Sequence, residues 1–284
     1  MGTIETAVEE QKGRMRKQAI AKRRTVNEAE RAKAGERLAA ATTQALRWFV
    51  TEPATTPATN PMANPFAKPT TGRTAKLPTT PITEASEGAI PNSAETTPQK
   101  QTEAAANNAA AINRDNEQPE QMRTISLSAG DTIAAYVSMG TEVPTLGLLD
   151  ALVEHGLRVL VPRLGRGRDI GWSEYLGSRL LRDMPRTSRG GLRPSEPESE
   201  ALGPDAIANA KIALIPAFAI DLDGTRLGRG GGWYDQALGC LPADALKIGV
   251  CWDWELIDGH DAVPREPHDI PVDAVLTPER IVWF

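Results

Sequence analysis

A long segment of biased composition divides this sequence into two parts. Threonine, alanine, proline and asparagine dominate residues 51–122, and prolines recur at every fourth position from Pro53 to Pro69. Each proline removes a backbone donor and fixes φ, and the segment has too few large apolar side chains to offset the entropy of ordering it. We therefore predict a disordered, partly polyproline-like insert at residues 51–122, between N-terminal helices in residues 1–50 and an α/β domain in residues 123–284.

The hydrophobic share of 40% and the charged share of 24% in the whole chain are near those of ordinary globular proteins. The net charge of -5 argues against a general nucleic-acid binder, which carries a basic footprint. Cys240 and Cys251 form neither a CxxC pair nor half of a zinc pattern. The N-terminus lacks the apolar run of a signal peptide, and no later segment is long and apolar enough to cross a bilayer. We expect a cytoplasmic monomer that contacts no nucleic acid and no membrane.

The N-terminal part is expected to form two helices. Residues 5–24 favour the first, and Asn27 is a plausible N-cap for the second. Four apolar side chains fall on one face of that second helix, namely Leu38, Ala41, Ala45 and Phe49. In the first helix Arg16 and Arg23 follow Lys12 by four and eleven residues, which brings all three to the same side. The alternative for this basic side is a solvated face.

After the insert, short apolar runs alternate with helical ones. A strand at residues 132–138, a helix at 145–155 and a strand at 158–161 predict a parallel crossover unit, with ligands expected beyond the carboxyl ends of the strands. In this helix Leu146, Leu149, and Leu152 or Val153 should share a face. Further strands are expected at residues 211–215, 247–251 and 274–276. Their continuous apolar character predicts an α/β fold with a Rossmann-like, mainly parallel sheet flanked by helices.

The most informative segment for function is rich in glycine and arginine. Residues 221–235, here called the glycine-rich segment, read Asp-Leu-Asp-Gly-Thr-Arg-Leu-Gly-Arg-Gly-Gly-Gly-Trp-Tyr-Asp between a predicted strand and a predicted helix. The glycines allow close backbone approach and align amide donors, and the following helix N-terminus adds a positive dipole. Arg226 and Arg229 add charge in a fork geometry suited to phosphate. Together these features predict a polyphosphate site.

Two common glycine motifs do not fit the glycine-rich segment. A dinucleotide fingerprint needs glycine where Trp233 stands, and a P-loop needs Lys followed by Ser or Thr after its last glycine. The remaining alternative is a hairpin in which Asp223 and Gly224 close two strands. Two arginines inside the cluster, and an aromatic-aromatic-Asp sequence directly after it, favour a ligand site over a plain turn.

The run from Arg226 to Asp235 resembles the signature of the 5-formyltetrahydrofolate cyclo-ligase family, which usually has Tyr where this chain has Trp233. Other stretches resemble the family in the same order along the chain: Lys12 and Arg16, Ser138 to Glu142 with Thr145, Val161 to Arg163, and Pro264 to Asp269 with Val272 and Asp273. The resemblance covers residues 5–50 and 130–280. The alignment at residues 190–197 is ambiguous, so no function is carried over there.

The resemblance implies an enzyme that phosphorylates the formyl oxygen of 5-formyltetrahydrofolate with Mg-ATP. Attack by N10 then closes the ring to 5,10-methenyltetrahydrofolate, and ADP and phosphate are released. An amide oxygen is a poor leaving group, and phosphorylation by ATP would overcome this by turning the oxygen into a phosphate ester. The protein's task would be positioning and charge stabilisation, with the N-terminal helices forming part of the catalytic domain.

The resemblance also implies a role for each site residue. ATP would be bound by Lys12, Arg16, Arg226, Leu227, Gly228, Arg229, Gly230, Gly231, Gly232, Trp233 and Tyr234. Catalysis would depend on Arg229, Tyr234 and Asp235. Asp235 and Asp269 would hold Mg²⁺, a hard cation that prefers carboxylates, water and phosphate oxygens. The alternatives are a helix N-terminal acid at Asp235 and a turn residue at Asp269.

The folate substrate is expected at a second group of residues, Val137, Glu142, Arg229 and Trp233. Glu142 would accept hydrogen bonds from the amino-pteridine edge, unless it is simply an exposed acid before a helix. Val137, Trp233 and Tyr234 would supply apolar and stacking surface. The two aromatics are also candidates for the core.

Three rival functions remain open. A paralogue that activates another amide or acid would bind other ligands in place of folates. A non-catalytic nucleotide or folate binder would need the glycine-rich segment but not the carboxylates at Asp235 and Asp269. A nucleic-acid module using the first helix would show salt-dependent RNA binding.

Overall fold

The computed structural model describes residues 2–49, 75–76, 125–163, 171–187, 190–257, 262–267 and 269–284. They belong to one compact unit, Met1–Leu77 with Met122–Phe284, whereas the second unit, Pro78–Gln121, lies outside the described residues. The three-part division of the chain and the disorder of residues 51–122 therefore stay predictions. One short piece of the predicted insert is described: Ala75–Lys76 form the two-residue strand β1.

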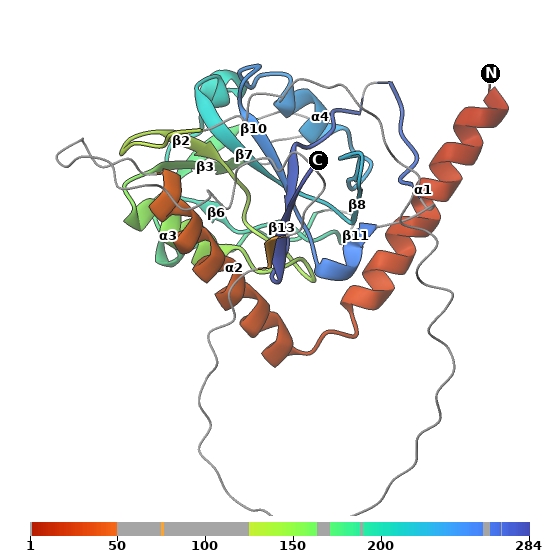
Figure 1. Ribbon diagram of the computed structural model, residues 1–284, viewed down its shortest axis with the longest axis horizontal. Coiled ribbons are helices and arrows are strands. Elements are labelled where there is room, and N and C mark those ends of the chain that lie inside the picture. Colours follow the sequence, from red (N-terminus) through yellow and green to blue (C-terminus); the bar gives the residue numbers. More distant parts are fainter. Residues whose placement is uncertain are drawn as a thin grey trace, which may run out of the picture. The chain divides into compact units, whose positions relative to one another are not determined.

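The central element is an eight-stranded sheet in the order β1-β13-β12-β10-β7-β2-β3-β4 (Figure 1). Its five inner strands pair in parallel: β12 (Ala274–Leu276), β10 (Leu246–Val250), β7 (Ala210–Pro216), β2 (Thr132–Ala134) and β3 (Arg158–Pro162). The antiparallel strands are β13 (Arg280–Trp283), β4 (Trp172–Tyr175) and β1. The predicted α/β fold with a mainly parallel sheet is confirmed.

Four of the five predicted strands match inner strands closely, because these runs are apolar on both faces. The first is shorter than predicted: β2 ends at Ala134, and residues 135–137 continue as a buried, non-strand segment toward the site. The antiparallel strands β13 and β4, of which β4 lies at an edge of the sheet, are additions that the crossover pattern does not predict. In β4 the sequence Trp-Ser-Glu-Tyr mixes polar and aromatic side chains, which weakens its strand signal.

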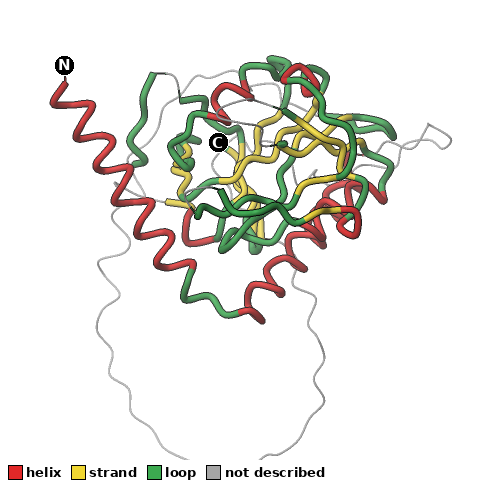
Figure 2. The backbone as a smooth tube through the Cα atoms, turned by 180° about the vertical axis from the view of Figure 1, so that it is seen from behind, coloured by secondary structure: helices red, strands yellow, loops and turns green. Residues whose placement is uncertain are grey.

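Two long helices precede the sheet in the chain. α1 (Gly2–Arg23) and α2 (Glu28–Phe49) are joined by a short connection, and Figure 2 shows the strands gathered to one side of both. Asn27 caps α2 as predicted: its Oδ1 accepts the Glu30 amide at 2.9 Å, and the Glu30 carboxylate accepts the Asn27 amide at 3.2 Å. Among the described residues, no helix is long and apolar enough to cross a membrane.

The predicted apolar faces are largely confirmed. On α2, Leu38 is fully buried and Ala41 nearly so, while the side chains of Ala45 and Phe49 lie outside the described part. On α3 (Leu146–Glu154), Leu149 and Leu152 are buried. Leu146, which begins the helix, is 38% exposed.

The shorter elements complete the unit. α4 (Trp233–Leu238) follows a three-stranded sheet in the order β11-β8-β9, formed by β8 (Ala219–Asp221), β9 (Arg226–Leu227) and β11 (Leu256–Ile257). The remaining pieces are β5 (Leu181–Arg182), β6 (Glu196–Pro197), and the 3₁₀ turns at Ser178–Leu180, Pro204–Ile207 and Asp253–Glu255. Met15, Ala19 and Ile20 of α1 pack against the three-stranded sheet.

The strand order identifies where a ligand site belongs. β2 comes first in the parallel set, with β3 on one side and β7 on the other, so the winding direction reverses between β2 and β7. In open α/β sheets, ligands bind outside the carboxyl ends of the strands at such a reversal. The segments that leave β2 and β7 are therefore the expected border of the site.

Candidate functional site

A cavity of about 490 Å³ lies at that reversal point. Tyr136, Pro162 and Pro216, which follow or end β2, β3 and β7, line it. The glycine-rich segment and one side of α1 complete the wall. The prediction of a ligand site beyond the carboxyl ends of the parallel strands agrees with this position.

The glycine-rich segment has two structurally different halves. β8 and β9 form an antiparallel hairpin, closed by a turn in which Gly224 has φ 74°. The Asp221 carboxylate holds the turn, because it accepts the amides of Asp223, Thr225 and Val263 at 3.1, 2.9 and 2.9 Å. The hairpin alternative is therefore correct for the first half of the segment only.

The second half, residues 228–232, is a loop that lines the cavity. Gly230 and Gly232 have φ of 84° and 67°, a left-handed backbone that favours glycine. A methyl group at Gly230 would lie 3.0 Å from Arg16 Nη2, so glycine also leaves room for the end of the Arg16 side chain. The helix after the loop, α4, has only six residues, and its expected dipole contribution is correspondingly small.

Two cations of α1 reach this loop and the C-terminal part of the chain. Lys12 is 5% exposed, and its Nζ lies 2.6 Å from Glu266 Oε2 and 2.9 Å from Asp269 Oδ2. Burial alone would lower the pKa of Lys12, but the two carboxylates outweigh it and hold that pKa above its ordinary value. Arg16 Nε donates to the Gly228 carbonyl at 2.9 Å. The solvated-face alternative is wrong for these residues.

Arg23 fixes the other end of α1 to the sheet. Its Nε and Nη2 donate to Glu255 Oε1 and Oε2 at 2.6 and 2.8 Å, and Nη2 also donates to the Ala217 carbonyl. Glu255 accepts the Trp252 amide, and the Trp252 indole donates to the Thr141 carbonyl at 3.1 Å. The predicted common side for Lys12, Arg16 and Arg23 is confirmed, but the role of Glu255 carried no sequence signal.

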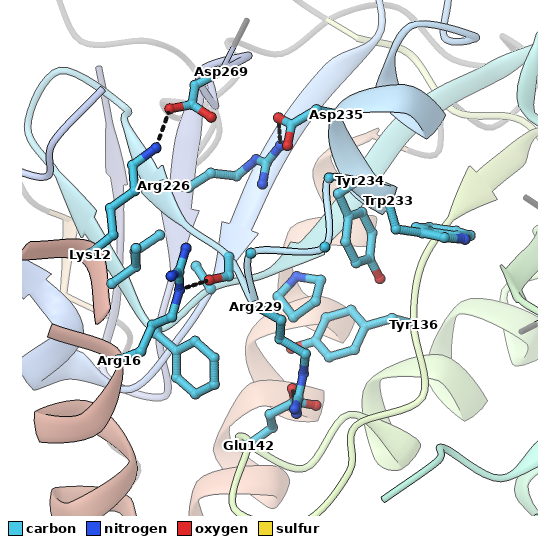
Figure 3. A pocket seen from close by; sticks show the side chains of 18 of the residues that line it. Lys12, Arg16, Tyr136, Glu142, Arg226, Arg229, Trp233, Tyr234, Asp235 and Asp269 are labelled. Atoms are coloured by element: carbon cyan, nitrogen blue, oxygen red, sulfur yellow. Dashed lines mark hydrogen bonds and ion pairs between the residues drawn. The ribbon is translucent and has the colours of Figure 1, made fainter. Parts of the chain in front are cut away.

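The two predicted metal carboxylates line the same cavity and are both ion-paired. Asp235 accepts from Arg226 in a close ion pair, and Asp269 Oδ2 accepts from Lys12 and from the Glu266 amide. Figure 3 shows both carboxylates on the side of the cavity where Lys12 and Arg226 lie. Within the described ranges, no group of three or more potential ligand residues surrounds a metal position.

Glu142, assigned by resemblance to folate, and Arg229, assigned to both ATP and folate, contact each other. Arg229 Nη2 donates to Glu142 Oε1 at 2.8 Å; the Glu142 side chain is 7% exposed and that of Arg229 52%. Glu142 Oε2 accepts the Met139 amide at 2.9 Å. Ser138 and Thr145 exchange hydrogen bonds of 2.9 and 3.0 Å across the ends of this loop, which holds Glu142 in place.

The aromatic residues border the cavity and pack into the core at the same time. The rings of Trp233 and Tyr234 meet edge to face with centroids 4.9 Å apart, and Trp233 lies 5.4 Å from Trp172. Both contact the core cluster beneath α4 as partly buried residues and both line the cavity. Val137 lines it as predicted, and Tyr136 lines it without having been predicted.

All predicted site residues therefore lie around one cavity, although the roles assigned to them stay predictions. Sequence reasoning missed several others, namely Arg23, Tyr136, Met139, Pro194, Phe218 and Glu266. Glu266 falls within the C-terminal stretch from Pro264 to Asp269, so its place in that motif could have identified it. Pro194 falls in residues 190–197, where the alignment is ambiguous.

A family model supports what the cavity suggests. The model of the 5-formyltetrahydrofolate cyclo-ligase family matches residues 96–278. A 5-formyltetrahydrofolate cyclo-ligase from Mycolicibacterium smegmatis is 40% identical over 157 residues, which cover 54% of this chain and 76% of the relative. The enzyme of the same name from Escherichia coli K12 is 29% identical over 156 residues, with 54% and 80% covered.

Two solved structures of 5,10-methenyltetrahydrofolate synthetases are also similar. The Aquifex aeolicus protein has 26% identity and a TM-score of 0.42 over 54% of this chain and 72% of that chain. The Mycoplasma pneumoniae protein has 16% identity and a TM-score of 0.49, with 94% and 99% covered. The assignment depends on the family model and on the curated relatives, and it places this chain in the 5-formyltetrahydrofolate cyclo-ligase family of ligases.

Proposed function

We propose that this protein converts 5-formyltetrahydrofolate into 5,10-methenyltetrahydrofolate, using ATP and releasing ADP and phosphate. The observation that carries the proposal is that cations of α1, the glycine-rich segment and Glu142 line a single cavity. Membership of the family supports the reaction class, since the matched curated relatives have this enzyme name. The residues at the two ends of the cavity support separate places for ATP and for the folate.

One end is suited to the phosphates of ATP. The backbone amides of residues 228–232 and the guanidinium of Arg16 are donors of the kind that bind phosphate oxygens. Arg226 is buried, and its Nε has no hydrogen-bond partner among the described residues, so a bound oxyanion would satisfy it. We infer that the triphosphate lies between α1 and the loop at residues 228–232, with Lys12 at its side.

The other end is suited to the flat ring of the folate. Glu142 is an acceptor for the N–H groups of an amino-pteridine edge, and Val137 and Trp233 offer apolar surface. Arg229 donates to one oxygen of Glu142. Folate binding would therefore release Arg229, whose exposed side chain is free to turn toward the transferring phosphoryl group.

The reaction needs the formyl oxygen to become a leaving group. The formyl oxygen attacks the γ-phosphorus of ATP as the bond to ADP breaks; N10 then attacks the formyl carbon, loses its proton, and phosphate departs with the oxygen. Arg229 and Arg226 would stabilise the charge on the transferring group. Burial raises the pKa of Tyr234, so its hydroxyl stays protonated and can donate to an oxygen of the substrates.

Asp235 and Asp269 would hold magnesium at the phosphate end. Their oxygens suit a hard cation, which keeps several waters and phosphate oxygens as further ligands, so a dedicated three-residue cluster is not required. Magnesium would neutralise phosphate charge during the transfer. Asp235 pairs with Arg226, and Asp269 pairs with Lys12. Bound phosphates would pair with these two cations instead.

A direct assay tests the proposed reaction. Purified protein is mixed with 5-formyltetrahydrofolate and Mg-ATP, and the near-ultraviolet absorbance of the methenyl product is followed together with ADP. We expect product and ADP in equal amounts, and Asp235→Ala and Arg229→Ala each to lower kcat/KM at least about 100-fold, the scale of losing a transition-state charge contact.

Arg182→Ala is the matched control for Arg229→Ala. Arg182 is 70% exposed and pairs with Glu198 away from the cavity, so its loss removes an ion pair without touching the site. We expect its activity to equal that of the wild type. Binding of ATP and folate by the wild type without turnover would instead identify a non-catalytic binder, and turnover of another amide or acid alone would identify a paralogue with a different substrate.

A further inference from the structure

Tyr136 occupies a position in the cavity wall that the proposed reaction does not yet use. Tyr136 follows β2 at the point where the strand order reverses, and the residue is only 4% exposed. Its carbonyl accepts the Thr145 hydroxyl at 2.9 Å, which fixes the backbone. Figure 3 shows its ring close to Arg229 and Glu142, and the ring lines the cavity.

The hydroxyl of Tyr136 makes no hydrogen bond to any residue that the structure describes, although the side chain is buried. Tyr175 provides the contrast: it is 1% exposed, and its hydroxyl donates to Asp150 Oδ1 at 2.6 Å. Polar groups inside proteins are normally paired. The Tyr136 hydroxyl belongs to a residue that lines the cavity and lacks a protein partner among the described residues, so it is available to a ligand.

The surroundings of Tyr136 keep its hydroxyl protonated. Burial raises the pKa of Tyr136 well above its ordinary value, the nearby Glu142 and Tyr234 raise it further, and Arg23 opposes them. At neutral pH the group is therefore a neutral donor. Beside it, the Glu142 carboxylate is an acceptor, so the two side chains present a donor and an acceptor to the same end of the cavity.

We propose that Tyr136 is a specificity residue of the folate end, whose hydroxyl donates a hydrogen bond to the ring carbonyl oxygen of the substrate. The pteridine edge carries N–H donors beside that carbonyl, so a carboxylate and a protonated hydroxyl together match its pattern. This inference rests on the proposed function, because it assumes a folate ring against Glu142. It assigns Tyr136 to binding and leaves the phosphoryl transfer to other residues.

The test compares Tyr136→Phe with the wild type by calorimetric titration with 5-formyltetrahydrofolate in the absence of nucleotide. We expect Kd for the folate to rise about 5- to 20-fold, the scale of one lost hydrogen bond between neutral groups. Kd for a non-hydrolysable Mg-ATP analogue should stay within about twofold, because the hydroxyl lies at the folate end. In turnover, KM for the folate should rise while kcat changes less than about threefold.

Tyr175→Phe is the matched control, since it removes the same atom from an equally buried tyrosine outside the cavity. We expect it to lower Tm, because Asp150 loses one of its hydrogen-bond donors, and to leave folate Kd unchanged. Tyr136→Phe should leave Tm of the ligand-free protein unchanged or raise it.

Four outcomes would overturn the inference. Unchanged folate Kd in Tyr136→Phe would show that the hydroxyl contacts no substrate atom. A fall in Tm as large as that of Tyr175→Phe, or equal weakening of the nucleotide analogue, would show a structural role. Failure of the wild type to bind folate at all would overturn the proposed function together with this inference, whereas wild-type binding with an unaffected variant would overturn the inference alone.

Discussion

Gly224 shows how a single residue sets the geometry of the glycine-rich segment. It closes the β8–β9 hairpin with φ 74°, and its carbonyl accepts the Val272 amide at 2.9 Å. A methyl group there would collide with the Val272 carbonyl oxygen and approach the Phe284 ring at 3.2 Å. Both the left-handed backbone and the close approach therefore require glycine.

We expect Gly224→Ala to cost clearly more stability than Gly130→Ala. Gly130 has φ 87° but open space around its α-carbon, so alanine there suffers only the left-handed conformation, about 1–2 kcal/mol. At Gly224 the steric conflict adds about 1–3 kcal/mol. Urea denaturation of both variants measures the difference, and equal losses of unfolding free energy would show that the turn relaxes without resistance.

At the scale of elements, the docking of α1 determines whether the cavity has a complete wall. Apolar contacts of Met15, Ala19 and Ile20 attach the helix to the three-stranded sheet. Arg23 and Glu255 then form a buried ion pair, with side chains 3% and 2% exposed. Burial alone would lower the pKa of Arg23, but Glu255 outweighs it and holds that pKa above its ordinary value. The position of α1 thus depends on apolar and ionic contacts together.

We expect Arg23→Ala to lower the free energy of unfolding by about 3–5 kcal/mol, because it leaves Glu255 buried without its partner. Since Lys12 and Arg16 lie on the same helix, KM for ATP should also rise. Arg182→Ala, which removes an exposed pair, should cost about 0–1 kcal/mol. Denaturant unfolding and nucleotide titration of both variants provide the measurement. A loss below about 1 kcal/mol for Arg23→Ala would show that apolar contacts alone hold α1.

At the scale of the whole molecule, we expect the proline-rich insert to be dispensable for the proposed reaction. Among the described residues that line the cavity, none comes from residues 51–122. Deletion of residues 55–118 should therefore leave kcat/KM within about threefold of the wild type. Deletion of residues 78–118 is the matched comparison, because it retains β1 at the edge of the sheet.

The two deletions distinguish catalysis from sheet stability. β1 pairs with β13 through Ala75 and Lys76, so the larger deletion exposes an edge of β13. We expect its Tm to be slightly lower than that of the shorter deletion, with equal activity. Serious loss of activity in both variants would contradict the interpretation of the insert as a linker.

Light scattering on the full chain would check the predicted monomer.

The sequence by itself determined the features that depend on local chemistry. Continuous apolar runs predicted β3, β7, β10 and β12, because strands buried on both faces must be apolar at every position. Glycines and arginines in residues 226–235 predicted a polyphosphate loop through backbone freedom and fixed charge. The spacing of Lys12, Arg16 and Arg23 predicted a shared helix side through the α-helical period.

The tertiary structure alone decided which of these groups meet. Lys12 pairs with Asp269 across 257 positions of sequence, and Arg229 pairs with Glu142 across 87. The Tyr136 side chain is buried, and its hydroxyl has no partner among the described residues. The buried Glu255 carboxylate, in contrast, is paired with Arg23. No local pattern encodes such pairs, because burial and hydrogen bonding depend on the distance between side chains once the sheet, α1 and the loops have packed together.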